Sequence, residues 1–242
     1  MKLIFIIGKK RSGKDTTADY LANNYKTKKF QLAGPIKDTL AGCWNPDLTQ
    51  KTGVSLNRLD FEGKGYDREQ ILLLNNKDVI DYMKRCVYRL LDHELKAGKR
   101  ENGFFIHDNG DFSFVGMNKI EDLINKNTKP WTVRRLMQTL GTDIFCNMVD
   151  RMYWLKLFAI DYVDSFHDDL DFYIVPDTRQ DHELDAARAM GATVIHVVRP
   201  NSESSQDTHI TEAGLPIRDG DIVITNDGSL EDLYSKIEKV IK

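Results

Sequence analysis

The sequence of 242 residues lacks long apolar runs and lacks an excess of charge of either sign. No window approaches the roughly 18 consecutive apolar residues of a membrane-spanning helix, so we expect no membrane partner. The formal net charge is −3, whereas a broad nucleic-acid footprint needs a clear basic excess to neutralise phosphates. Composition therefore predicts a globular protein with no nucleic-acid partner.

Cysteine is scarce as well. Cys43, Cys86 and Cys146 are odd in number and form no C-x-x-C pair, which favours reduced thiols over disulfides or a cysteine-bound metal. The apolar run Leu3–Ile7 is too short for a signal peptide, and a glycine-rich segment follows it directly. We therefore expect a cytoplasmic protein.

Both ends of the chain alternate between strand-like and helix-like segments. The predicted strands are Lys2–Ile7, Asp171–Val175, Thr193–Val198 and Asp221–Thr225. The predicted helices are Thr16–Asn24, Asp181–Met190 (with Asp181 as N-cap and Gly191 as the C-terminal stop) and Ser229–Lys242. This alternation predicts an α/β protein with a doubly wound, mostly parallel sheet.

The middle of the chain departs from this alternation. It contains predicted helices at Asn76–Leu91, Met117–Asn125, Thr132–Leu140 and Met148–Phe166, and a hairpin of Phe104–Asp108 with Asp111–Val115 that turns on Asn109-Gly110. We therefore expect one domain with its core at residues 1–42 and 171–242 and a mostly helical insertion at about residues 43–170. The insertion either closes over a substrate or only thickens the domain.

A phosphate-binding pattern follows the first predicted strand. Residues 8–14 (GKKRSGK) fit the Walker A pattern G-x-x-x-x-G-K, in which glycines let backbone N–H groups point at an anion and the following helix adds its dipole. Lys14 is expected to reach the β- and γ-phosphates of a nucleoside triphosphate. The predicted ATP-binding residues here are Lys10, Gly13, Lys14, Asp15, Thr16 and Thr17.

One position departs from the pattern, because Asp15 stands where Ser or Thr usually supplies an oxygen to Mg²⁺. Asp15 or the following Thr16 is expected to hold the metal, directly or through water. The pattern does not choose between them. Arg11 either clamps phosphate during catalysis or belongs to a solvated run of charges.

A GTPase switch is the main alternative among P-loop proteins, and the sequence disfavours it. Such proteins read guanine with N-K-x-D, whereas Asn118-Lys119 is followed by Ile120-Glu121 and Asn76-Lys77 by Asp78-Val79. The string Asp60–Gly63 spells D-x-x-G, but no predicted strand precedes it. We interpret it as a chance match.

Two further segments carry candidate site residues. Asp177 follows a predicted strand, where a carboxylate holds Mg²⁺ through water, orients a hydroxyl or simply caps a helix or turn, and Arg179 would grip a phosphoryl group. Arg134 and Gln138 lie one helical turn apart, so that a guanidinium could bind phosphate and an amide could read a base edge. The alternative is a surface helix with a solvated Arg134.

These residues belong to stretches that closely resemble the deoxynucleoside monophosphate kinases of T-even bacteriophages, a family of P-loop nucleotide kinases. The resemblance runs along almost the whole chain and includes the unusual Asp15. The matching stretches are Lys10–Ala18, Gln31–Asp38, Phe61–Glu69, Val133–Asp143, Asp150–Trp154, Tyr173–Glu183, Ala186–Pro200 and Asp207–Ser229. The regions Trp44–Leu59 and Leu95–Asp111 fit poorly.

The resemblance implies an ATP-dependent kinase of 2′-deoxynucleoside 5′-monophosphates (dNMPs) that uses Mg²⁺, forms a homodimer and acts in the host cytoplasm. On this basis the expected catalytic residues are Lys14, Arg11, Asp177 and Arg179, and Asn226 would border the adenine. The expected dNMP-binding residues are Lys37, Arg68, Arg134, Gln138, Gly141, Thr142 and Trp154. Residues 201–218 are polar, lack strong periodicity and follow a predicted strand, so they form either a lid over ATP or an ordinary surface loop. The alternatives are a P-loop kinase for another small phosphorylated acceptor and a nucleotide-binding regulator without turnover.

Overall fold

The computed structural model describes residues 1–9, 11–96, 105–108, 111–114, 117–200 and 215–241. The chain divides into two compact units. We call Met1–Leu32 with Trp154–Lys242 the sheet unit, and Ala33–Tyr153 the helical unit. The helical unit includes most of the expected insertion at about residues 43–170. Lys10, the Asn109-Gly110 turn and most of the expected lid lie outside the described residues.

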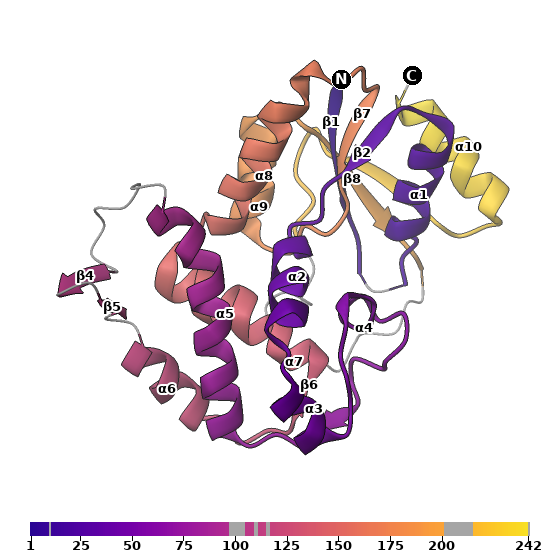
Figure 1. Ribbon diagram of the computed structural model, residues 1–242. Coiled ribbons are helices and arrows are strands. Elements are labelled where there is room, and N and C mark those ends of the chain that lie inside the picture. The colour runs from indigo at the N-terminus through magenta and orange to yellow at the C-terminus, as the bar shows by residue number, and fades with distance from the viewer. Residues whose placement is uncertain (10, 97–104, 109–110, 115–116, 201–214, 242) are drawn as a thin grey trace. The chain divides into compact units, whose positions relative to one another are not determined.

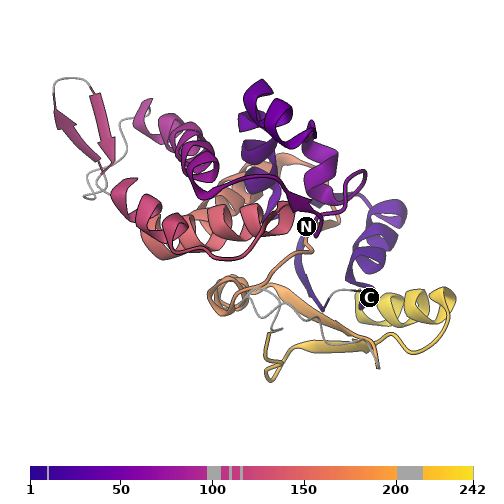
Figure 2. The same ribbon diagram turned by 90° about the horizontal axis from the view of Figure 1, so that it is seen from below.

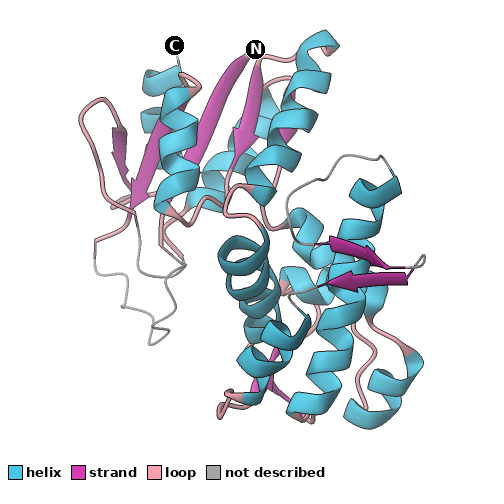
Figure 3. Ribbon diagram, turned by 90° about the vertical axis from the view of Figure 1, so that its left-hand side faces the viewer, coloured by secondary structure: helices cyan, strands magenta, loops and turns pink. Residues whose placement is uncertain are grey.

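The sheet unit is built on five parallel strands. They are β1 (Lys2–Ile7), β2 (Thr27–Lys29), β7 (Phe172–Val175), β8 (Thr193–Val198) and β9 (Ile222–Thr225). Their spatial order is β2-β7-β1-β8-β9, and every neighbouring pair runs parallel. Figure 3 shows these strands side by side with helices against them. The predicted α/β class with a parallel sheet is confirmed.

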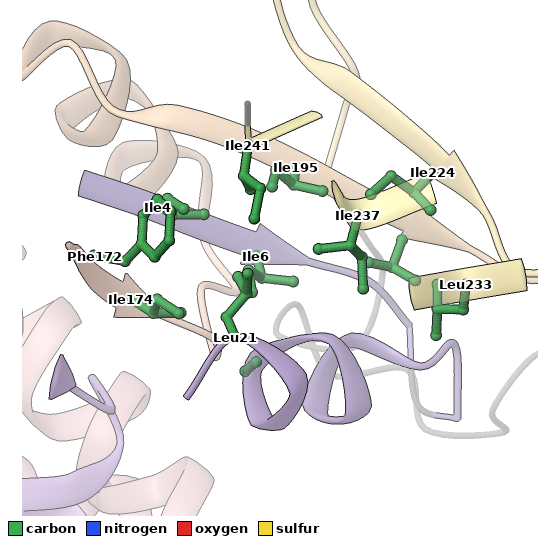
Figure 4. Close-up of a cluster of buried hydrophobic side chains, with 12 residues drawn as sticks. Ile4, Ile6, Leu21, Phe172, Ile174, Ile195, Ile224, Leu233, Ile237 and Ile241 are labelled. Carbon is green, nitrogen blue, oxygen red and sulfur yellow. The ribbon is translucent and has the colours of Figure 1, made fainter. Parts of the chain in front are cut away.

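Helices cover both faces of this sheet. The helices are α1 (Lys14–Asn24), α8 (Tyr153–Asp164, followed by the 3₁₀ turn η2, Ser165–His167), α9 (Asp181–Ala189) and α10 (Leu230–Ile241). On one face Ile4 and Ile6 pack with Leu21 of α1 and with Leu233 and Ile237 of α10 (Figure 4). Figure 2 shows α1 and α10 next to each other.

The opposite face carries α8 and α9. The rings of Phe5 in β1 and Phe158 in α8 meet edge to face with centroids 5.5 Å apart. Ile7 at the end of β1 packs with Leu184 of α9. Because successive side chains of a strand point to opposite faces, β1 is buried on both sides and reads as one apolar run. The doubly wound arrangement predicted from the sequence is confirmed.

The helical unit consists of short elements around a buried core that includes Leu40, Phe61, Tyr82 and Phe145. Its helices are α2 (Gly34–Cys43), α3 (Pro46–Thr52), α4 (Arg58–Glu62), α5 (Asn76–Lys96), α6 (Met117–Asn125), α7 (Val133–Gln138) and the π-helical segment η1 (Thr139–Val149). One antiparallel ladder joins β3 (Ile71–Leu72) to β6 (Trp131–Thr132). A second joins β4 (Phe105–Asp108) to β5 (Asp111–Phe114), which are labelled in Figure 1. The second ladder confirms the antiparallel pairing of the two strands of the predicted hairpin.

Three local predictions were wrong. Asp181 is the first residue of α9 rather than its N-cap, because Gln180 keeps an extended backbone (φ −125°, ψ 147°). The helix expected at Thr132–Leu140 begins at Val133, and from Thr139 its winding widens into η1. The helix expected at Met148–Phe166 is interrupted, because Asp150 is extended and its carboxylate accepts the N–H of Met152 at 2.8 Å.

Two further findings concern the cysteines and the length of the helices. Cys43, Cys86 and Cys146 are all free thiols. Among the described helices, none has both the length and the apolar character needed to cross a bilayer.

Candidate functional site

The connections of two adjacent strands define the edge of the sheet where a ligand is expected. The chain leaves β1 for α1 on one face, whereas it leaves neighbouring β7 for α9 on the other. In open α/β sheets ligands bind outside the carboxyl ends of strands at such a switch point. Here that edge carries the phosphate loop, residues 8–13, and the turn at residues 176–180.

The backbone of the phosphate loop curls as the glycine pattern requires. Arg11 (φ 65°) and Gly13 (φ 105°) are both left-handed, and the Ser12 N–H donates to the Lys9 carbonyl at 3.1 Å. A side chain at position 13 would also place its Cβ 2.5 Å from Nδ2 of Asn226. Glycine is therefore required at position 13 both for its φ angle and for this close approach.

Lys14 opens α1 and is paired with its neighbour. Its Nζ lies 2.7 Å from Oδ1 of Asp15, and the side chain of Lys14 is 13% exposed whereas that of Asp15 is 79% exposed. Thr17 is fully buried and its hydroxyl donates to the Gly13 carbonyl at 3.0 Å, so it closes the first turn of the helix. Thr16 is half-buried.

Asp15 and Thr16 offer the hard oxygen donors that Mg²⁺ prefers. This ion usually takes only one or two protein carboxylates and completes its shell with water and substrate phosphates. Among the residues that the structure describes, no group of three or more His, Cys, Asp or Glu side chains is able to hold a metal ion. The oxygen donors of Asp15 and Thr16 therefore fit a metal held largely by a nucleotide.

Asn226 anchors the phosphate loop from the end of β9. Its Nδ2 donates to the Ser12 carbonyl at 2.9 Å, and its backbone N–H donates to the Val198 carbonyl at 2.7 Å. The side chain is buried. The Asn226 side chain thus holds the loop in place by bonding the backbone of Ser12. The expected contact of Asn226 with adenine stays a prediction.

A cavity of about 300 Å³ opens beside the loop within the sheet unit. Its lining includes the cations Lys14, Arg179 and Arg199 and an apolar wall of Val197, Val198 and Leu215. A pocket with an apolar wall and converging cations suits a ligand that has both a flat apolar part and anionic groups. The structure therefore brings Lys14 and Arg179 to one cavity, and their roles toward phosphate stay predictions.

The turn that carries Arg179 is held by two carboxylates. Oδ1 of Asp177 accepts the N–H of Leu32 at 2.8 Å, and Oε2 of Glu183 accepts the N–H groups of Arg179 at 2.7 Å and Gln180 at 3.0 Å. Burial raises the pKa of Glu183 to about 7, although the two N–H donors oppose this shift. The sequence analysis missed Glu183, which lies three residues after Gln180 in the spacing of a capping box.

A second buried carboxylate, Asp221, contacts His196, which lines the cavity. Asp221 lies 3.0 Å from Nε2 of His196 and 2.6 Å from Nη2 of Arg188, and it accepts the N–H of Arg218 at 3.0 Å. The hydrogen bond from Arg188 is the main reason why the pKa of Asp221 is lowered to about 2. These bonds tie the segment before β9 to β8 and α9.

In the helical unit the acceptor candidate Lys37 is already paired. Its Nζ lies 2.9 Å from Oε2 of Glu62, and its side chain is only 7% exposed. Arg58 bonds the other oxygen of Glu62 at 2.5 Å and also Asp38 at 2.5 Å. Burial opposes ionisation of Glu62, but the bonds from Lys37 and Arg58 prevail and lower its pKa.

Arg68 and Arg134 lie next to each other. The backbone N–H of Arg134 donates to the Arg68 carbonyl at 3.0 Å, and the guanidinium of Arg134 pairs with Glu69. The side chain of Arg134 is 14% exposed, so the alternative of a solvated surface arginine is wrong. Gln138, one turn further on, is the last residue of α7.

The remaining acceptor candidates are buried. A Cβ on Gly141 would lie 2.6 Å from Cδ1 of Ile36, so this glycine lets η1 approach α2 beside Lys37, and Thr142 follows it in η1. Trp154, 4% exposed, belongs to the sheet unit. The helical unit therefore brings six of the seven acceptor candidates onto α2, α7, η1 and the chain between α4 and β3.

The sequence was compared with protein-family models and with known proteins. Residues 2–237 match a family model described as deoxynucleotide monophosphate kinase. A deoxynucleotide monophosphate kinase of Enterobacteria phage T4 is 57% identical over 246 residues, which cover 100% of this chain and 99% of the relative. One from Escherichia phage RB69 is 53% identical over 253 residues, with 100% of both chains covered. A putative deoxynucleotide monophosphate kinase of Acanthamoeba polyphaga mimivirus is 29% identical over 115 residues, 44% of this chain and 59% of the relative.

Proposed function

Because the chain belongs to the deoxynucleotide monophosphate kinase family, we propose that it transfers the γ-phosphoryl group of ATP to dNMPs and forms ADP and deoxynucleoside diphosphates. The observation that carries this proposal is the full-length identity to the phage kinases. It is supported by a phosphate loop whose Lys14 shares a cavity with Arg179.

ATP is the donor in this proposal, and its phosphates bind along Gly8–Thr17. The loop N–H groups and the dipole of α1 favour negative charge at this end of the helix. Lys14 meets the β- and γ-phosphates, and Arg11 and Arg179 stabilise the charge of the transferring group. The apolar wall near Val198 receives the base, with Asn226 at its border.

Mg²⁺ is the proposed cofactor. Asp15 or Thr16 would hold it near the phosphates, where the ion neutralises negative charge on the triphosphate. Asp177 braces the turn of Arg179 and is the further candidate for orienting water around the ion.

The acceptor dNMP is proposed to bind the helical unit. Lys37, Arg68 and Arg134 hold its α-phosphate, and Gln138, Gly141 and Thr142 contact the rest of the nucleotide. The expected contact of the dNMP with Trp154, a residue of the sheet unit, stays a prediction. The attacking phosphate oxygen is already anionic, so no strong general base is required. Catalysis then rests on positioning and on electrostatic stabilisation of the transferring phosphoryl group.

The proposal extends to the setting of the reaction. We place the enzyme in the host cytoplasm as a homodimer that supplies precursors for phage DNA synthesis. Sedimentation of the purified protein tests the dimer, since a monomer at all accessible concentrations would remove that part of the proposal.

One assay separates this proposal from its alternatives. The purified protein is incubated with ATP, Mg²⁺ and a panel of dNMPs, ribonucleoside monophosphates and other phosphorylated metabolites, and ADP is measured. We expect ADP with dNMPs above all other acceptors. A better rate with another phosphorylated acceptor favours a different P-loop kinase, and no ADP with any acceptor favours a regulator without turnover.

A further inference from the structure

Two hydroxyl groups near the phosphate loop are buried without a hydrogen-bond partner in the described part of the chain. They are Oγ of Ser12, a residue 1% exposed, and Oγ1 of Thr178, a residue 6% exposed. Burying a hydroxyl without a partner opposes folding, so native proteins nearly always satisfy such groups. A pair of unsatisfied hydroxyls therefore calls for a ligand that completes them.

Both hydroxyl-bearing residues line the same cavity as Lys14 and Arg179. Ser12 comes from the phosphate loop after β1, and Thr178 comes from the turn after β7, so the two hydroxyls approach from the two strands of the switch point. An oxygen-rich anion bound between two cations accepts hydrogen bonds from hydroxyls as well. The residues that line the cavity therefore include two with buried hydroxyl groups as well as the cations.

The position of Thr178 is fixed from both sides. Its neighbour Asp177 is bonded to the backbone of Leu32, and its neighbour Arg179 is bonded through its N–H to the buried carboxyl of Glu183. A donor held in this way needs little reorganisation when a ligand arrives. Side-chain packing alone does not account for the hydroxyl, because valine has the same shape without the buried polar atom.

We propose that the hydroxyls of Thr178 and Ser12 donate hydrogen bonds to phosphate oxygens of the nucleotide bound in this cavity. The inference rests on the proposed function, in which that nucleotide is ATP and then ADP. It adds two neutral donors to the cations of the site and makes Thr178 a contact residue beside Arg179.

The test uses Thr178→Val, which keeps the shape and removes the hydroxyl. Thr178→Ser is the companion variant that keeps the hydroxyl and removes the methyl group. Thr27→Val is the matched control, because Thr27 lies in the same unit and its hydroxyl already donates to the Leu21 carbonyl at 3.3 Å. For each full-length variant, the dissociation constants of ATP, ADP and adenosine and the Tm without nucleotide are measured.

We expect Thr178→Val to bind ATP and ADP about 10-fold more weakly, the typical loss for a hydrogen bond to a charged group. Its Tm without nucleotide should be unchanged or higher, because an unsatisfied hydroxyl has been removed. Thr178→Ser should bind ATP nearly as well as the wild type, and Thr27→Val should bind it equally well with a lower Tm. Binding of adenosine, which has no phosphate, should not change in any variant.

Two results would overturn the inference. The first concerns Thr178→Val and a further variant, Ser12→Ala, which lacks the other hydroxyl. Dissociation constants of ATP and ADP that are unchanged in both single variants would overturn the inference. The other is a lower Tm of Thr178→Val with equal losses for ATP and adenosine, which would mean that the hydroxyl stabilises the protein itself. Failure of the proposed function looks different, because the wild type would then form no ADP from ATP and any dNMP.

Discussion

The candidate donor site and the candidate acceptor site are built in different ways. In the sheet unit the phosphate loop is positioned by the backbone, through the φ angles of Arg11 and Gly13 and the bond from Asn226 to Ser12. In the helical unit the candidate cations are positioned by carboxylates, since Lys37 pairs with Glu62 and Arg134 with Glu69. The first site thus depends on the conformation of the loop backbone, although its Lys14 is also paired with Asp15, whereas the second depends on ion pairs between side chains.

This difference has an energetic consequence for the two substrates. A triphosphate that enters the loop meets the dipole of α1 and competes with Asp15 for Lys14. A monophosphate that binds Lys37 or Arg134 competes with Glu62 or Glu69 for the same cation. Removing one member of a buried pair such as Lys37–Glu62 leaves the other charge uncompensated, so variants of Lys37 should affect both affinity and stability.

The largest expected effect concerns Lys14. Lys14→Met should lower kcat by about 10²-fold or more with the fold intact, because the ammonium meets charge that develops on the transferring phosphoryl group. Steady-state kinetics and circular dichroism check this. Lys29→Met is the matched control, since Lys29 forms an exposed ion pair of the same 2.7 Å length with Asp19. Near-normal turnover of Lys14→Met would remove Lys14 from the mechanism.

Arg134→Ala should act on the acceptor side selectively. We expect KM for the dNMP to rise by about 10-fold or more while KM for ATP changes little, because a charge-assisted bond to the α-phosphate is lost. Initial rates with each substrate varied in turn give both constants. Glu69→Gln is the companion variant, because it frees Arg134 from a competing carboxylate and should not raise KM for the dNMP. Equal increases in both KM values for Arg134→Ala would assign Arg134 to the donor site or to structure.

A severalfold effect is expected at Asp15. Asp15→Asn keeps the shape and removes the anionic oxygen, so activity should fall and the Mg²⁺ concentration for half-maximal rate should rise severalfold if the carboxylate helps to hold the ion. The measurement is a Mg²⁺ titration of the rate at fixed ATP. An unchanged titration with weaker ATP binding would leave Asp15 the role of bracing the loop through Lys14.

The smallest expected effect is on stability and concerns Glu183. Burial raises the pKa of this carboxyl from 4.5 to about 7 in the folded protein. Between pH 4.5 and about pH 7, Glu183 is protonated in the folded protein but ionised in the unfolded chain. The contribution of Glu183 to the free energy of unfolding therefore falls as the pH rises through this range. Urea unfolding of the wild type and Glu183→Gln should therefore diverge across this window, by on the order of 1 kcal/mol or more.

Asp232 provides the control for this experiment. It occupies the same third position of α10, but hydrogen bonds from Ser229 lower its pKa below 3.8. The stability that Asp232 contributes is thus complete above that pH and is lost only as pH falls. The difference between the wild type and Asp232→Asn should stay flat between pH 4.5 and 7. A flat difference for Glu183→Gln as well would mean that the buried carboxyl does not hold its proton there.

The contrast between the two units also explains which parts of the structure can be predicted from the sequence. The strands Lys2–Ile7 and Thr193–Val198 are continuous apolar runs, and the phosphate loop is a local pattern, so local chemistry is enough to find them. The helices Gly34–Cys43 and Arg58–Glu62 have only 10 and 5 residues, so they depend on packing with distant parts of the chain. Likewise Glu62 lies 25 residues from Lys37 and Glu69 lies 65 from Arg134, so no local pattern reveals these pairs.

The central claim is that the sheet unit binds the donor and the helical unit binds the acceptor. Calorimetric titration of Lys14→Met and Arg134→Ala with ATP alone and with an accepted dNMP alone tests it without turnover. The account predicts that Lys14→Met loses affinity for ATP but keeps its affinity for the dNMP, and that Arg134→Ala does the reverse. Loss of affinity for both ligands to the same extent in either variant would contradict the account.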